Sequence, residues 1–190
     1  AYYSAGDFND SLKLYLNVLD SETEASFYDR ACIGVLLSLY RKKEYQEVIF
    51  YGNKIIETMK EGALASEALY LLGSSYFNVN NVAEAEKVYK KNYTLYSYTI
   101  YGLKSALNRC WSLFDLKQYD ECIKSVDEYV SKVKDVASIL IINSRAEALY
   151  VKAKALAEIK KVTEAMNVYK EVIDEYKLSE FRKEAIYETA

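Results

Sequence analysis

The chain has 190 residues, of which 51% are hydrophobic and 28% charged, so it can bury a large core and does not have the composition of a disordered protein. Histidine is absent, which excludes a Ser-His-Asp triad, a Cys-His pair and an imidazole metal ligand. The net charge is −3 with the two signs interspersed, which argues against a nucleic-acid partner because a phosphate backbone requires a basic stripe.

Proline is absent and glycine occurs six times, a composition that predicts helices joined by short connections. The longest apolar run, residues 136–142, is too short to insert into a membrane, which takes about 20 residues. Both ends of the chain look like helix interiors, so we interpret it as part of a longer protein. We therefore expect no information on its compartment, and a bacterial periplasmic or envelope-associated location and a cytoplasmic one both stay open.

A polar pair followed by a hydrophobic residue recurs along the chain and predicts a series of tight turns. These segments begin 37, 37, 37 and 43 residues apart, at Gly6, Lys43, Asn80, Lys117 and Lys160. Small residues and mostly apolar residues follow each turn, separated from one another by three, four or seven positions, which places them on one helical face. The first residue of each turn is expected in the left-handed conformation, which suits glycine and asparagine better than lysine.

A second pattern precedes the turns and predicts another amphipathic helix in each unit. Glu-Ala-Leu-Tyr occurs at 67–70 and 147–150, and Glu-Ala-Ile-Tyr at 184–187. Each repeat is therefore expected to be two helices and a turn, in a single array with the approximate units 1–23 (partial), 24–61, 62–98, 99–134, 135–178 and 179–190 (partial). The six extra residues of unit 135–178 predict a first helix that is extended at its N-terminus.

These units resemble tetratricopeptide repeats. The matching features are the Leu72-Gly73 pair, Tyr76, the turn at 80–82, Ala85 and Tyr89. The resemblance implies an all-α fold class, in which antiparallel helix-turn-helix repeats stack into a right-handed α-solenoid. The chain departs from the family in lacking the helix-ending proline and in its period of 37 rather than 34 residues, a longer variant similar to bacterial envelope-associated members.

In this family the first helix of each repeat lines a concave groove. The resemblance therefore implies a groove formed by Ile33, Leu37, Tyr40, Tyr70, Phe77, Lys104, Leu107, Trp111, Phe114, Tyr150 and Lys154. Its aromatic residues either bind a peptide or partner protein or pack between neighbouring first helices, and both interpretations stay open. A carboxylate clamp of the kind that holds chaperone tails is not expected, because only Lys104 matches its pattern.

We expect a non-catalytic protein-interaction scaffold with no cofactor and no metal. The chain has neither a glycine-rich phosphate loop nor a nucleophile with a positioned base, so we do not expect an enzyme. The alternative is an oligomerisation or assembly module that self-associates through terminal repeats near Tyr2 and Ile186, since terminal repeats need a polar cap.

Small residues are expected where the two helices of a repeat come closest: Gly73 with Ala85, Cys110 with Cys122, and Ala153 with Ala165. The cysteine pair is either a disulfide or switch, or two small core residues, and we favour the core interpretation.

Overall fold

The protein is described here by a computed structural model that covers residues 13, 17, 25–59, 62–136 and 138–190. These residues form nine α-helices and one short 3-10 helix, with no strand among them. Unit 1–23, and with it Gly6 and Tyr2, lies outside the described residues apart from Lys13 and Asn17. No helix in the described ranges is long and apolar enough to cross a bilayer.

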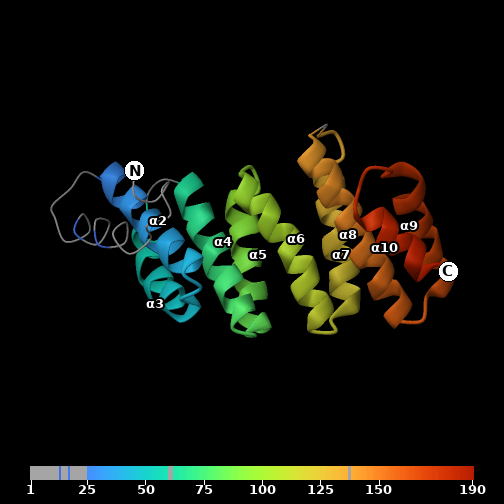
Figure 1. The fold of residues 1–190 in the computed structure, drawn as a ribbon, viewed down its shortest axis with the longest axis horizontal. Helices are drawn as coiled ribbons and strands as arrows, with labels where there is room; N and C mark the ends of the chain where they lie inside the picture. Colours follow the sequence, from blue (N-terminus) through green and yellow to red (C-terminus); the bar gives the residue numbers. More distant parts are fainter. Residues whose placement is uncertain (1–12, 14–16, 18–24, 60–61, 137) are drawn as a thin grey trace. The chain divides into compact units, whose positions relative to one another are not determined.

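The helices form antiparallel pairs joined by tight turns (Figure 1). The pairs are α2 (Ala25–Arg41) with α3 (Tyr45–Ile55), α4 (Gly62–Asn78) with α5 (Val82–Tyr96), α6 (Ile100–Asp115) with α7 (Tyr119–Val133), and α8 (Ile139–Glu158) with α9 (Val162–Glu175). The 3-10 helix Ile56–Thr58 follows α3, and α10 (Phe181–Glu188) follows α9. The predicted all-α class of helix-turn-helix repeats is confirmed.

Two compact units divide the chain, residues 1–105 and residues 106–190, and the division falls within α6. The first unit contains α2 to α5 and the beginning of α6. The second unit contains the rest of α6 and α7 to α10.

Each described turn has one residue in the left-handed conformation. The φ angles are 62° at Lys43, 60° at Asn80, 58° at Lys117 and 64° at Lys160, which confirms the predicted turn residues. At the second turn Asn80 N donates to Phe77 O and Asn81 N to Tyr76 O, both at 2.9 Å. These bonds satisfy carbonyls left over at the end of the first helix, and the other three turns repeat the pattern.

The core of the first unit lies between α2, α3 and α4, where Leu36, Val48 and Ala68 are fully buried. The next interface, between α4 and α5, depends on Gly73. A Cβ at Gly73 would lie 2.7 Å from Cε1 of Tyr89, so the tyrosine ring occupies the space that a larger residue would need. The predicted partner of Gly73 across the helix interface is Ala85. The side chain that packs against Gly73 is instead that of Tyr89, four residues further along α5.

A buried polar network connects α4, α5 and the first residues of α6. The Asn92 side chain is fully buried, and its Nδ2 donates to Ser66 O and to Ser105 Oγ, both at 2.8 Å. Ser66 Oγ donates to Asn92 Oδ1 at 2.9 Å. Because a buried amide without partners is costly, this network favours one register between the three helices.

The second unit packs α8 against both α7 and α9, and α10 against α8 and α9. Helix α8 has 20 residues, against 17, 17 and 16 in α2, α4 and α6, which confirms the predicted longer first helix. Cys122 Sγ donates to Cys110 O at 3.3 Å, and both thiols are buried and free, as the core interpretation predicts.

We predict that Lys160→Gly stabilises the protein. A left-handed conformation costs a non-glycine residue roughly 1–2 kcal/mol, and glycine avoids this cost. Part of the gain is lost because glycine has a higher conformational entropy in the unfolded chain. The free energy of unfolding in urea should rise by about 0.5–1 kcal/mol. The control is Lys170→Gly on the exposed surface of α9, which should lower it by about 1 kcal/mol. Equal losses from both substitutions would contradict the prediction.

We also predict that the native thiols resist modification. Burial raises the pKa of Cys32 to about 11 and that of Cys122 to about 12, and it raises the pKa of Cys110 as well. Because the thiolate is the reactive form, Ellman's reagent at pH 8 should label the native protein slowly and all three cysteines at once in urea. A single reactive thiol in urea without reductant would instead indicate a disulfide.

Candidate functional site

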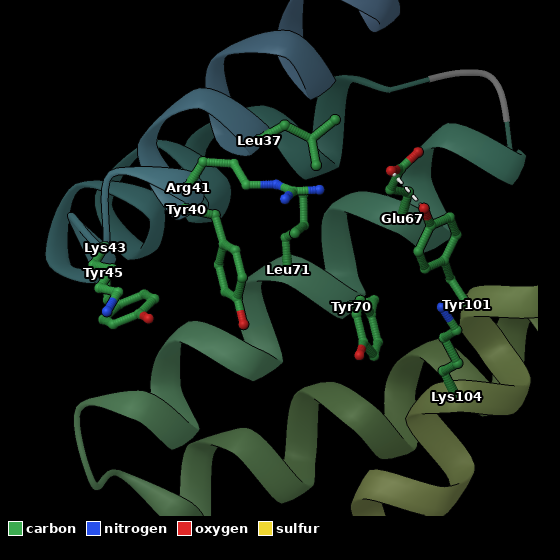
Figure 2. A pocket seen from close by; sticks show the side chains of 10 residues that line it. All are labelled: Leu37, Tyr40, Arg41, Lys43, Tyr45, Glu67, Tyr70, Leu71, Tyr101 and Lys104. Atoms are coloured by element: carbon green, nitrogen blue, oxygen red, sulfur yellow. Dashed lines mark hydrogen bonds between the residues drawn. The ribbon is translucent and has the colours of Figure 1, made fainter. Parts of the chain in front are cut away.

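An open pocket of about 390 Å³ lies on the first-helix side of the first unit (Figure 2). Helices α2 and α4 and the beginning of α6 supply most of its walls, and the α2–α3 turn closes one end. Its lining residues are Leu37, Tyr40, Arg41, Lys43, Tyr45, Glu67, Tyr70, Leu71, Tyr101 and Lys104.

Tyrosine rings dominate the pocket. Tyr40 meets Tyr45 edge to face with ring centroids 5.3 Å apart, and Tyr70 lies 5.4 Å from Tyr101. Burial, with smaller effects from Tyr70 and Tyr45, raises the pKa of Tyr40, although hydrogen bonds with Ser74 and Asn78 oppose the shift. Aromatic rings held in this way offer apolar faces and hydroxyl groups to a ligand at a low entropic cost.

Cations outnumber carboxylates around the pocket. Arg41, Lys43 and Lys104 line it together with one acidic residue, Glu67, whose Oε1 accepts a 2.7 Å hydrogen bond from the Tyr101 hydroxyl. Lys104 Nζ lies 5.4 Å from the centroid of the Tyr101 ring and 5.8 Å from that of Tyr70. Within the described ranges none of the three cations forms an ion pair.

The residues predicted for the groove in the first unit occupy different places. Leu37, Tyr40, Tyr70 and Lys104 line the pocket. Ile33 is only 6% exposed and belongs to the core between α2, α3 and α4. Phe77 is exposed near the end of α4 and is not among the lining residues.

Sequence reasoning did not place Glu67, Tyr101, Lys43 and Tyr45 at this site. Tyr101 precedes Lys104 by three residues on the same helix, so the two side chains share a face. This spacing could have predicted Tyr101 at the same site as Lys104. Lys43 and Tyr45 reach the pocket only because of the direction in which the α2–α3 turn points them, which no periodicity indicates.

The predicted groove residues of the second unit form an aromatic cluster on α6 and α8. The ring of Trp111 lies 6.3 Å from that of Phe114 and 6.4 Å from that of Tyr150. Phe181 of α10 packs 5.6 Å from Tyr150. Tyr150 and Leu107 are 7% and 8% exposed, whereas Trp111, Phe114 and Lys154 are half-buried.

Helix α10 supplies a carboxylate to this cluster. Lys154 Nζ lies 5.6 Å from the centroid of the Tyr150 ring and 5.8 Å from that of Phe114, and it donates to Glu188 Oε1 at 3.4 Å. The Tyr150 hydroxyl donates to the same oxygen at 3.1 Å. Burial, the hydrogen bond and the charge of Glu188 together raise the pKa of Tyr150 to about 12.

A second carboxylate lies beneath the cluster. Trp111 Nε1 donates to Glu147 Oε1 at 2.8 Å. Burial raises the pKa of Glu147, and the hydrogen bond from Trp111 only partly offsets this shift. In the part of the chain that the structure describes, no three acidic or thiol groups come together in a way that could hold a metal ion.

Comparison with known proteins supports the repeat assignment. The tetratricopeptide repeat model matches residues 67–91 and 147–179. No curated protein sequence matches the chain significantly. The predicted resemblance to tetratricopeptide repeats is confirmed by these two matches together with the folds of the solved structures that follow.

Several solved structures share the fold at low sequence identity. MamA has a TM-score of 0.74 at 14% identity, over 93% of this chain and 92% of that chain. YrrB, a TPR protein with an unusual peptide-binding site, has a TM-score of 0.73 at 16% identity, over 98% and 87%. PlcR of Bacillus thuringiensis in its apo form has a TM-score of 0.70 at 13% identity, over 100% and 74%.

We predict that Glu147→Gln stabilises the protein more at pH 7 than at pH 4. With its pKa raised by folding, Glu147 stabilises the folded state when it is protonated, and this contribution is lost as the pH rises through the folded-state pKa. Glutamine keeps an acceptor for Trp111 and has no such loss. Urea unfolding of the variant and the wild type at both pH values measures the difference.

The control for this prediction is Glu158→Gln, an exposed position near the end of the same helix. It should change the stability little at either pH. A stability difference between the Glu147 variant and the wild type that is the same at both pH values would contradict the predicted role of burial.

Proposed function

We propose that this protein of tetratricopeptide-like repeats is a non-catalytic interaction scaffold whose first unit binds a peptide segment of a partner protein in the pocket described above. The observation that carries the proposal is the pocket itself, because its walls bring four tyrosines from α2, α3, α4 and α6 around one space of about 390 Å³. Such a volume takes a few side chains of an extended or helical peptide.

The chemistry of the lining supports binding rather than catalysis. Tyrosine and arginine are the residue types that most often carry binding energy at protein interfaces, and both are present here. The acidic residue that lines the pocket, Glu67, accepts a hydrogen bond from Tyr101, an arrangement that fixes a ring in place. The fold shared with YrrB, which has a peptide-binding site, agrees with this proposal.

In the second unit we propose the same role for the half-buried Trp111, Phe114 and Lys154. Three of the residues predicted for the groove, Ile33, Leu107 and Tyr150, are left out of the proposed binding residues because each is less than a tenth exposed. In the first unit Phe77 stays among the proposed binding residues, because its aromatic side chain on α4 is exposed.

The second candidate function is an oligomerisation or assembly module of a larger complex. The observation that favours it is the exposure of apolar side chains at the end of the second unit, where Leu178 is 88% and Tyr187 83% exposed and Ile186 is also exposed. Exposed apolar side chains of this kind mark interaction surfaces, so this surface is a candidate for self-association. Light scattering over a range of protein concentrations tests it.

We predict that Tyr40→Ala and Tyr70→Ala each weaken peptide binding by about 10–30-fold, as expected for truncation of a central aromatic anchor. The probes are dodecapeptides selected on the wild-type protein from a random phage-displayed library and then synthesised with a fluorescent label. Fluorescence anisotropy measures their affinity, and far-UV circular dichroism checks that each variant keeps its helices.

The matched control is Tyr98→Ala, because Tyr98 is 76% exposed in the connection between α5 and α6 and does not line the pocket. This variant should bind the peptides as the wild type does. Peptides that bind the folded Tyr40 and Tyr70 variants with wild-type affinity would overturn the proposed site.

A further inference from the structure

We propose that the segment bound in this pocket is acidic, and that Lys104 receives one of its carboxylates beside the rings of Tyr70 and Tyr101 while Arg41 and Lys43 attract a second. This inference rests on the proposed function and names the chemistry of its ligand. It concerns a peptide whose Asp or Glu side chains provide the charge.

The charge of the pocket is opposite to that of the chain. The protein carries a net charge of −3, yet three cations and one carboxylate line this pocket. The carboxylate, Glu67, is oriented by the Tyr101 hydroxyl, and among the described residues it forms no ion pair with Lys104. A local excess of positive charge on an acidic protein selects a negatively charged ligand and accelerates its association.

A lysine in the second unit, Lys154, shows which group binds an ammonium held between two aromatic rings. Lys154 is placed like Lys104: its Nζ lies 5.6 and 5.8 Å from two aromatic rings, and that of Lys104 lies 5.4 and 5.8 Å from two rings. In both cases one ring comes from the lysine's own helix and the other from the preceding first helix. Lys154 holds a carboxylate, Glu188 of α10, at 3.4 Å.

No described residue supplies the corresponding carboxylate to Lys104. The rings on either side restrict the position of the ammonium group, which faces the pocket together with the tyrosine side chains (Figure 2). An acidic side chain entering the pocket can therefore take the place that Glu188 has next to Lys154. The open pocket makes each added ion pair modest in strength, and we expect the acidic preference to come from the three cations together.

The test compares three pools of randomised, fluorescently labelled dodecapeptides. Every pool contains one fixed tyrosine and one fixed leucine, and two further fixed positions carry Glu, Gln or Lys. On the wild-type protein the Glu pool should bind about 10-fold more tightly than the Gln pool at about 0.05 M salt, and the difference should shrink at about 0.5 M.

Arg41→Gln with Lys104→Gln should remove most of the preference for the Glu pool over the Gln pool, because Lys43 is then the one cation left among the lining residues. The matched control is Lys54→Gln, because Lys54 Nζ also lies over an aromatic ring, 3.7 Å from the centroid of Phe50, but on α3 and outside the pocket lining. It should keep the full preference for the Glu pool.

The outcomes separate this inference from the proposed function. Equal binding of the Glu and Gln pools, lost in Tyr70→Ala, would overturn the acidic ligand and leave a peptide-binding pocket. Binding of no pool, or binding that does not depend on Tyr70, would overturn both. Single-stranded oligothymidine that binds through Lys104 more tightly than the Glu pool would also overturn the inference, since the occupant would then be a nucleic acid.

Discussion

The four tight turns with one residue in the left-handed conformation are the constraint on which each unit depends. Lys43, Asn80, Lys117 and Lys160 reverse the chain within a few residues, so the second helix of a pair must return along the first. Consecutive first helices of a unit consequently share a side, and the pocket of the first unit is lined mainly from that side. Three of these positions are lysines, so helix reversal is maintained against an unfavourable backbone conformation.

Aromatic residues of the first helices have two roles: some line an open pocket, and others pack against a neighbouring helix. In the first unit the rings of Tyr40 and Tyr70 border an open space. In the second unit Tyr150 is covered by Phe181 and Glu188 of α10, and its ring is nearly inaccessible. The aromatic and acidic residues of α10 therefore bury Tyr150, while Trp111 and Phe114 of the same cluster stay half-buried.

The lysines beside these aromatic rings also differ between the two units. Lys154 and Glu188 satisfy each other within the second unit, whereas the cations of the pocket are left to a ligand. The buried side chain of Asn92 finds its partners inside the first unit, in Ser66 and Ser105, and this network contributes to helix register rather than to recognition.

The sequence by itself determined the helices, the turns and the longer α8, because these depend on local periodicity and on conformations that a few residues dictate. The resemblance to tetratricopeptide repeats also implied that Leu37, Tyr40, Tyr70 and Lys104 share one side of the first helices, and these four residues line the pocket. Only the tertiary structure decided that Tyr89 fills the space at Gly73, that Ile33 is core, and that Tyr45 and Lys43 reach the pocket. The physical reason is that helical periodicity fixes the face on which a residue lies, whereas packing between elements distant in the chain decides whether that face stays open.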